Sequence, residues 1–245
     1  MKLKDKVAIV TGACQGMGRL MALGLAGAGA RVVVNDIQDE KAIKDLLAAI
    51  KELGGKTFYA RGDVSSEEDV QKIVSATIEA FGRIDVLVNN AGLRTIAYLG
   101  RDSCPVLEME VKDWDRMLAV NLRGPFLLSK AVLPQMIKQK QGSIINITSG
   151  AAHKAVPGKS AYSASKHGLE GLTKSLAGEV SRYNIRVNAL EPGGRVDVDN
   201  RGGLRADVVV PACLFLASDE SQTLTGQSII ATQWNKPQRS GSQNV

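Results

Sequence analysis

The amino-terminal pattern of strand, glycine-rich turn and helix places the strongest constraint on what this chain can fold into. Residues 7–10 are wholly apolar, as in strands buried on both faces of a parallel sheet. A glycine-rich turn follows at residues 11–18, and Leu20, Leu23 and Ala26 then recur at helical spacing. Such glycines let backbone N–H groups approach a pyrophosphate at the positive end of a helix. The spacing, Gly-x-x-x-Gly-x-Gly, departs from the simpler Gly-x-Gly-x-x-Gly fingerprint.

The alternation of strands and helices continues along the chain. Further strands are predicted at residues 31–35, 56–60, 84–88, 143–147, 185–190 and 228–230, and further helices at 39–53, 67–81, 114–140 and 161–182. Strands that alternate with helices pair in parallel through right-handed crossovers. No linker, repeat or low-complexity stretch divides the pattern. We therefore expect a single doubly wound α/β domain over residues 1–245, with a mostly parallel seven-stranded sheet and helices on both faces.

An acidic residue follows the second predicted strand. Asp36 lies eighteen residues after Gly18, where a carboxylate accepts hydrogen bonds from the ribose hydroxyls of a bound dinucleotide and repels a 2′-phosphate. The glycine turn carries Gln15 rather than a basic residue before Gly16. The pocket is therefore expected to bind NAD rather than NADP. The alternative is that Asp36 only caps the helix predicted at residues 39–53.

Three residues in the second half of the chain have the chemistry of a proton-transfer site. Tyr162 and Lys166 stand four residues apart, so on a helix they share one face. A phenol titrates near pH ~10, and a neighbouring ammonium favours its ionised form. Ser149, after the strand predicted at residues 143–147, is able to hold a substrate oxygen. Taken alone, this spacing is a weak signal, because such a pair on a helix is usually a surface tyrosine and a solvated lysine.

Composition argues against several other classes of protein. No apolar run reaches the ~18 residues of a membrane span, and no signal-like segment opens the sequence. Cys14, Cys104 and Cys213 are widely spaced, which indicates reduced thiols in a cytoplasmic protein and no metal site. The net charge of +6 comes from scattered Lys and Arg, and only 4% of residues are aromatic, so we expect no nucleic-acid partner.

The order of the motifs resembles the short-chain dehydrogenase/reductase family of the classical type, from Val7 to about Gln227. The resemblance rests on the glycine turn at residues 11–18, the Asn-Asn-Ala-Gly motif at residues 89–92, Asn121, and the set Ser149, Tyr162 and Lys166. It implies a Rossmann fold, a nicotinamide cofactor and a homodimer or homotetramer. The implied activity is NAD-dependent interconversion of a secondary alcohol and its ketone.

The resemblance also implies a role for each site residue. Tyr162 would be the general acid/base, Ser149 would position the substrate oxygen, and Lys166 would lower the pKa of the tyrosine while holding the nicotinamide ribose. Asn121 would support a proton-relay water. The cofactor-binding residues implied are Gly12, Gln15, Gly16, Met17, Gly18, Asp36, Asp63, Val64, Asn90, Ala91, Gly92, Tyr162, Lys166, Pro192 and Gly193.

The sequence departs from the family pattern after Pro192-Gly193. The usual hydrophobic residue and threonine are replaced by Gly194-Arg195-Val196-Asp197, and the lid segment that follows is short and polar. The short lid therefore leaves open a cofactor-binding scaffold or sensor with little turnover. The basic net charge leaves open, separately, a nucleic-acid-binding protein.

The short lid also predicts an open cleft for a bulky or anionic substrate. Arg94, His153 and Lys154 would hold that substrate, together with the long loop at residues 93–112. Alternatively these side chains are merely solvated, and a neighbouring subunit or the Trp234 tail completes the pocket.

Overall fold

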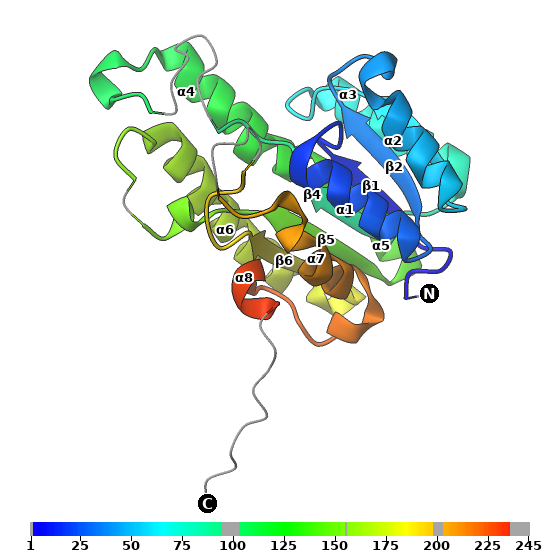
Figure 1. Cartoon of the computed structure of the whole chain (residues 1–245). Helices are drawn as coiled ribbons and strands as arrows, with labels where there is room; N and C mark the ends of the chain where they lie inside the picture. Colours follow the sequence, from blue (N-terminus) through cyan, green and yellow to red (C-terminus); the bar gives the residue numbers. More distant parts are fainter. Residues whose placement is uncertain (1, 95–102, 155, 198–202, 236–245) are drawn as a thin grey trace, which may run out of the picture.

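The computed structural model describes residues 2–94, 103–154, 156–197 and 203–235, and its centre is a seven-stranded sheet (Figure 1). The strand order is β3-β2-β1-β4-β5-β6-β7, and all six neighbouring pairs are parallel. The strands are β1 (Val7–Thr11), β2 (Arg31–Asp36), β3 (Thr57–Arg61), β4 (Val86–Asn89), β5 (Gly142–Ile147), β6 (Ile185–Glu191) and β7 (Ser228–Ile230). The prediction of a doubly wound parallel sheet is confirmed.

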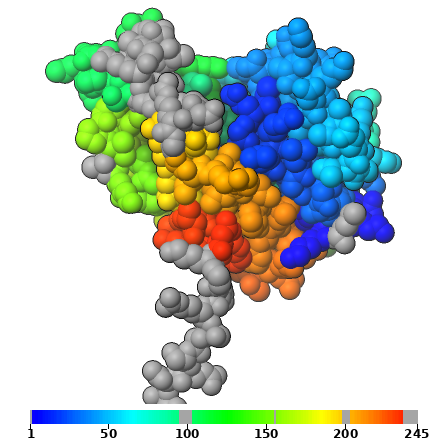
Figure 2. Space-filling model, viewed as in Figure 1, coloured from blue at the N-terminus to red at the C-terminus, as the bar shows by residue number. Residues whose placement is uncertain are grey.

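Helices cover both faces of the sheet. Helices α1 (Gly16–Gly27), α2 (Glu40–Glu52) and α7 (Val210–Ala217) share one buried cluster with Ala8 and Val10 of β1. Helices α3 (Glu67–Phe81), α5 (Gly124–Gln139) and α6 (Ser160–Val180) share the other with Val7 and Ile9. Alternate residues of one strand thus enter opposite cores, which explains why the strand is apolar throughout. On the surface of the first layer, the orange α7 segment lies against the blue amino-terminal segment (Figure 2).

Short elements complete the chain between these helices and strands. Helix α4 (Val111–Leu118) precedes α5, and α8 (Ala231–Trp234) follows β7. Single turns of 3₁₀-helix are η2 (Val106–Glu108), η4 (Gly150–Ala152), η5 (Ser181–Tyr183), η6 (Ala206–Val209) and η7 (Asp219–Ser221). None of the helices described is long and apolar enough to cross a membrane. Within the same described ranges, no three His, Cys, Asp or Glu side chains are grouped as metal ligands.

The long helix predicted at residues 114–140 is interrupted in the structure. A π-helical turn, η3 (Ala119–Arg123), separates α4 from α5. The wider turn carries Asn121 inward, and Gly168 of α6 allows Leu122 to approach closely, because a Cβ there would stand 2.8 Å from a Leu122 methyl. Periodicity did not reveal this break, since a single π turn leaves the apolar pattern on either side intact.

The carboxyl ends of the parallel strands form one edge, at which loops can build a site. Thr11 ends β1 there, and its hydroxyl oxygen accepts hydrogen bonds from the backbone N–H groups of Asn90 and Ala91, each at 3.0 Å. The same hydroxyl donates to the Val88 carbonyl at 3.2 Å. One buried side chain therefore ties the first glycine-rich turn to the loop after β4.

Candidate active site

The glycine-rich turn adopts a conformation that larger residues resist. Gly12 and Gly16 have φ of +61° and +55°, in the left-handed region. At Gly18 an added Cβ would stand 2.3 Å from the Gly12 carbonyl oxygen and 2.5 Å from the Asn90 amide nitrogen. Gln15 occupies the N-cap of α1 without a side-chain hydrogen bond, and no acidic residue lies in the first turn. The free N–H groups at this helix end fit a pyrophosphate.

Asp36 lies beside this turn at the end of β2. One oxygen of its carboxylate accepts a hydrogen bond from Cys14 N–H at 2.9 Å, and the other accepts from Ile37 N–H at 2.8 Å. The N-cap of α2 is Asp39, whose carboxylate accepts from Ala42 N–H at 3.0 Å. The alternative reading of Asp36 as the helix cap is therefore wrong, and its carboxylate instead lies against the glycine turn at Cys14.

Asp63 and Val64 follow β3. The Asp63 carboxylate accepts hydrogen bonds from the Ser65 hydroxyl at 2.7 Å and from the Arg116 guanidinium of α4 at 2.8 Å. Burial would raise the pKa of Asp63, but these hydrogen bonds outweigh it and lower the pKa below its usual value. Val64 is buried against Gly124, where a Cβ would stand 3.0 Å from its methyl group. The side chain of Asp63 is thus held in place by α4.

The Asn-Asn-Ala-Gly motif links β4 to the glycine turn. The Asn90 side chain donates hydrogen bonds to the carbonyls of Thr11 at 2.9 Å and Gly12 at 3.0 Å. Gly92 stands where a Cβ would be 3.3 Å from Asn121 Oδ1 and 3.7 Å from Lys166 Nζ. The motif therefore borders both the glycine turn and the predicted catalytic residues.

Asn121 is fully buried and clamps the chain after Gly92. Its Oδ1 accepts from Leu93 N–H at 2.7 Å, and its Nδ2 donates to Leu93 C=O at 2.8 Å and to Ser165 Oγ at 3.1 Å. The π turn is what brings this amide between the loop after β4 and helix α6. The structure thus assigns Asn121 a bracing contact that its place in the motif did not reveal.

Ser149, Tyr162 and Lys166 converge as the sequence predicted. Ser149 follows β5 and hydrogen-bonds the Tyr162 side chain. The Lys166 ammonium is buried, donates to Ile147 C=O at 2.8 Å, and lies 5.8 Å from the centroid of the Tyr162 ring. The three side chains come from the end of one strand and one face of the next helix.

The electrostatics of this group differ from the sequence expectation. Burial raises the pKa of Tyr162, and the charge of Glu191 adds to the rise, whereas the Ser149 hydrogen bond and the charge of Arg94 oppose it. Burial also lowers the pKa of Lys166 to about 8. In the protein alone, desolvation therefore disfavours both the phenolate and the ammonium. The pKa of the tyrosine stays above its usual value in the protein alone, because burial outweighs the Ser149 hydrogen bond and the charge of Arg94.

Pro192 and Gly193 form a tight turn after β6. Gly193 has φ of +91°, and a Cβ there would stand 2.0 Å from the Thr232 hydroxyl oxygen. Two backbone hydrogen bonds join the two ends of the shortened lid segment. Leu204 N–H donates to Arg195 C=O, and Asp197 N–H donates to Leu204 C=O, each at 2.8 Å. Residues 198–202 of the predicted lid, and residues 95–102 of the long loop, lie outside the described residues.

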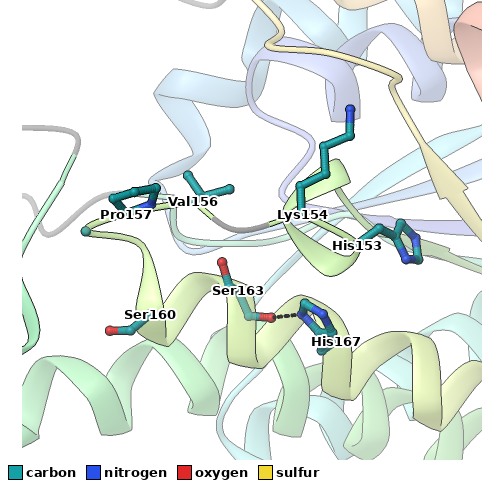
Figure 3. A pocket seen from close by; sticks show the side chains of 8 residues that line it. His153, Lys154, Val156, Pro157, Ser160, Ser163 and His167 are labelled. Carbon is teal, nitrogen blue, oxygen red and sulfur yellow. Dashed lines mark hydrogen bonds between the residues drawn. The ribbon is translucent and has the colours of Figure 1, made fainter.

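A groove of about 490 Å³ lies between the segment after Ser149 and the start of α6 (Figure 3). His153, Lys154, Ser163 and His167 are among its lining residues. The Lys154 side chain points away from α6 in this view. Trp234 packs on Phe215 of α7, with ring centroids 4.3 Å apart.

Two charged residues near the site were missed by sequence reasoning. Glu191 acts on Tyr162, as does Arg94, which the sequence had already placed near the substrate, and Arg61 pairs in register with Asp36 across β2 and β3. Glu191 directly precedes Pro192, so adjacency to that motif was the available signal. Only the parallel register brings Arg61 next to Asp36.

Fold and site together define an oxidoreductase that uses a nicotinamide dinucleotide. A family model described as short chain dehydrogenase matches residues 6–208. The chain is 44% identical to an uncharacterized oxidoreductase of Thermotoga maritima, covering 94% of this chain and 96% of the relative. It is 37% identical to the 3-oxoacyl-(acyl-carrier-protein) reductase FabG of the same organism, covering 94% and 97%.

A solved structure, NAD⁺-bound xylitol dehydrogenase, superposes on this chain with a TM-score of 0.86. The two chains are 30% identical, and the match covers 94% of this chain and 98% of that one. This protein belongs to the short-chain dehydrogenase family.

The packing of Gly18 yields a test of the glycine turn. Gly18→Ala should weaken binding of NADH about tenfold or more, roughly 1.4 kcal/mol, because the added methyl displaces either the Gly12 carbonyl or Asn90. Gly27→Ala in the same helix is the matched control, since a Cβ there meets nothing within 4 Å. Calorimetric titration measures both variants. Equal affinities would show that the turn does not contact the dinucleotide.

Proposed function

We propose that the protein is an NAD(H)-dependent oxidoreductase that interconverts a secondary alcohol and its ketone, with Tyr162 as general acid/base. The observation that carries this proposal is the convergence of Ser149, Tyr162 and a buried Lys166 at the edge where the glycine turn and Asp36 also lie. The alternative, a binding scaffold with little turnover, gains no specific support from this arrangement.

The residues divide the chemistry between them. Ser149 would hold the substrate oxygen, and Tyr162 would take up the hydroxyl proton in oxidation or return it in reduction. Lys166 would hold the nicotinamide ribose and stabilise the phenolate. Asn121 fixes the loop that follows Gly92, and Gly92 lies next to the Lys166 ammonium group. When bound, the cofactor supplies hydride chemistry and, in its oxidised form, a positive charge. That charge would oppose the raised pKa of Tyr162.

The preference for NAD over NADP rests on Asp36. A carboxylate beside the glycine turn would accept hydrogen bonds from ribose hydroxyls and repel a 2′-phosphate. Arg61 works against this preference, because it lies next to Asp36 in register and its Nε donates to Ile37 C=O at 3.2 Å. We propose that the Asp36 carboxylate has a larger effect on the choice of cofactor than Arg61 does, since it lies directly against the glycine turn at Cys14.

Cofactor selectivity is tested by replacing Asp36. The wild type should bind NADH more tightly than NADPH by about 2–3 kcal/mol, the scale of a like-charge contact with lost hydrogen bonds. Asp36→Ala should narrow this gap by improving NADPH binding, and adding Arg61→Leu should remove the improvement. Asp39→Ala is the control, because it removes a helix cap and leaves the turn intact. Equal wild-type affinities for both cofactors in calorimetry would contradict the proposal.

Catalysis is tested on the tyrosine and lysine of α6. Tyr162→Phe should retain NADH binding and lose turnover by ~10²–10⁴-fold, because the proton acceptor is gone. Lys166→Ala should weaken cofactor binding as well as turnover. The oxidation rate should rise with a pKa well below ~10 once the cofactor is bound.

Two substitutions on the same helical segment serve as controls for these variants. Tyr183→Phe and Lys174→Ala alter exposed or half-exposed side chains remote from the predicted site and should leave rates unchanged. Rates are followed through NADH absorbance during a screen of alcohols and ketones. Substantial activity of Tyr162→Phe on a true substrate would make the acid/base assignment wrong.

For the substrate and the cellular location, only general classes are proposed. We propose a small-molecule alcohol or ketone, an open cleft suited to bulky or anionic substrates, a single domain, and a cytoplasmic location. Arg94 supports the anionic substrate, since its charge already acts on Tyr162.

We also propose a homodimer or homotetramer. Its support is a groove of about 890 Å³ bordered by Leu122, Phe126 and Leu172, in which Phe126 is 46% exposed. The charged residues of this groove are Asp115, Lys112, Arg116 and Arg123, so it offers groups of both signs to a second copy.

Assembly is tested by placing a charge in the groove. Phe126→Asp should lower the mass measured by sedimentation equilibrium, because a carboxylate would be buried between two copies. Leu53→Asp is the control, since Leu53 is equally exposed on the surface after α2. A wild-type monomer would contradict the proposal outright.

A further inference from the structure

The segment that follows β3 begins beside the residue predicted to hold the adenosine ribose. Gly62 N–H donates to Asp36 C=O at 3.0 Å, so Asp63 is the next residue along this edge of the sheet. Its backbone is held by helix α3, because Asp63 N–H donates to the Asp69 carboxylate at 2.9 Å. Backbone contacts therefore fix the place of Asp63 on the edge, and its side-chain torsions decide where its carboxylate faces.

The carboxylate of Asp63 has one acceptor position left. Oδ1 accepts hydrogen bonds from the Ser65 N–H at 2.8 Å and from the Ser65 hydroxyl at 2.7 Å. Oδ2 accepts from Nη2 of Arg116 at 2.8 Å. An ionised carboxylate accepts about four hydrogen bonds, about two at each oxygen. Among the described residues one position on Oδ2 is therefore unused, and the side chain is 30% exposed to a ligand or to solvent.

Arg116 reaches this carboxylate from a distant part of the chain. It lies on α4, 53 residues from Asp63 in sequence, and its Nη1 donates to the Ser65 hydroxyl at 2.7 Å. One guanidinium therefore binds Oδ2 and also the hydroxyl that binds Oδ1. Because a guanidinium is planar and its N–H groups diverge at fixed angles, these contacts set the orientation of the carboxylate. The Ser65 contacts by themselves form a local turn that holds only Oδ1.

The charge state of Asp63 makes it an acceptor of hydrogen bonds near neutral pH. Burial raises its pKa, but the hydrogen bonds from Ser65 and Arg116 outweigh burial and hold the pKa below its ordinary value. An ionised carboxylate has no proton to donate. Adenine carries an amino group at position 6, which donates, whereas hypoxanthine carries a carbonyl oxygen there. The open position on Asp63 therefore suits adenine better than hypoxanthine.

We propose that Arg116 is a positioning residue of the cofactor site, which holds the Asp63 carboxylate in the orientation that accepts a hydrogen bond from the 6-amino group of adenine. The inference rests on the proposed function, because it takes the dinucleotide to bind along this edge with its adenine at Asp63. Arg116 acts through Asp63 and Ser65, so its loss should affect recognition of the base rather than proton transfer at Tyr162.

Calorimetric titration with two dinucleotides tests this role. NADH and reduced nicotinamide hypoxanthine dinucleotide differ only in the base. The wild type should bind NADH at least about tenfold more tightly, the scale of one hydrogen bond to a charged acceptor. Arg116→Met keeps the length of the side chain and removes its donors, so this preference should fall to about threefold or less, because the carboxylate regains rotational freedom. Asp63→Ala gives the ratio that remains when the carboxylate is absent.

A double-mutant cycle shows whether Arg116 acts through Asp63. In an Asp63→Ala background, adding Arg116→Met should change neither affinity, because the group to be positioned is gone. Arg116→Lys should give an intermediate ratio, since one ammonium group lacks the fork that binds both Oδ2 and the Ser65 hydroxyl. Both dinucleotides are titrated into the same preparation, so a loss of folded protein lowers the number of sites and leaves the ratio of affinities unchanged.

Two other basic residues that border the groove of about 890 Å³ are matched controls. Arg123 Nη2 donates to the Ser65 carbonyl at 2.8 Å, so it holds the same segment without a recorded bond to the Asp63 carboxylate. Arg123→Met should change both affinities by one factor and leave their ratio at the wild-type value. Lys112 pairs with Glu110 of its own segment at 2.6 Å, and Lys112→Met should leave both affinities as in the wild type.

The outcomes separate this inference from the proposed function. A ratio in Arg116→Met equal to that of the wild type would overturn the inference, as would an equal effect of this substitution with and without Asp63. NADH binding without any preference for the base would also overturn it, and the oxidoreductase proposal would still stand. Wild-type protein that binds neither dinucleotide would contradict the proposed function itself.

Discussion

Burial of the Lys166 ammonium group is the constraint on which the rest of the site depends. The group is 5% exposed and reaches Ile147 C=O at the end of β5, directly below the Tyr162 ring. Desolvation lowers the pKa of the lysine to about 8 and raises that of the tyrosine. Both charged forms are thus disfavoured in the protein alone, so the site is set to gain from any positive charge or hydrogen bond that a bound cofactor and substrate add.

Hydrogen bonds from buried and half-buried side chains connect the loops that surround this pair. The π turn brings Asn121 between Leu93 and Ser165, and Thr11 ties the loop after β4 to the glycine turn. Arg116 couples α4, which leads into that turn, to Asp63 on the opposite side of the edge. The proposed cofactor and catalytic regions therefore meet at the loop after β4, which is hydrogen-bonded both to Thr11 and to Asn121.

Charge around the site is balanced locally. Arg94 and Ser149 favour the phenolate, Glu191 opposes it, and His153 lies between Glu191 and Glu170. On the cofactor side, Asp36 and Arg61 stand next to each other across two strands. The ionisation of Tyr162 and the proposed preference for NAD therefore depend on opposing charges at close range rather than on the net charge of the chain.

The sequence by itself determined the sheet, its parallel pairing and the strand ends that carry the motifs, because apolar runs, glycine turns and helical periodicity are local signals. It also placed Tyr162 and Lys166 on one helix face, since four-residue spacing on a helix is local too, whereas Ser149 was grouped with them by the order of the motifs. The tertiary structure alone decided the π turn at Asn121, the N-cap at Asp39 rather than Asp36, and the neighbours Glu191 and Arg61. It also reversed the expected direction of the Tyr162 pKa, because desolvation depends on everything packed around a group, and no spacing along the chain encodes it.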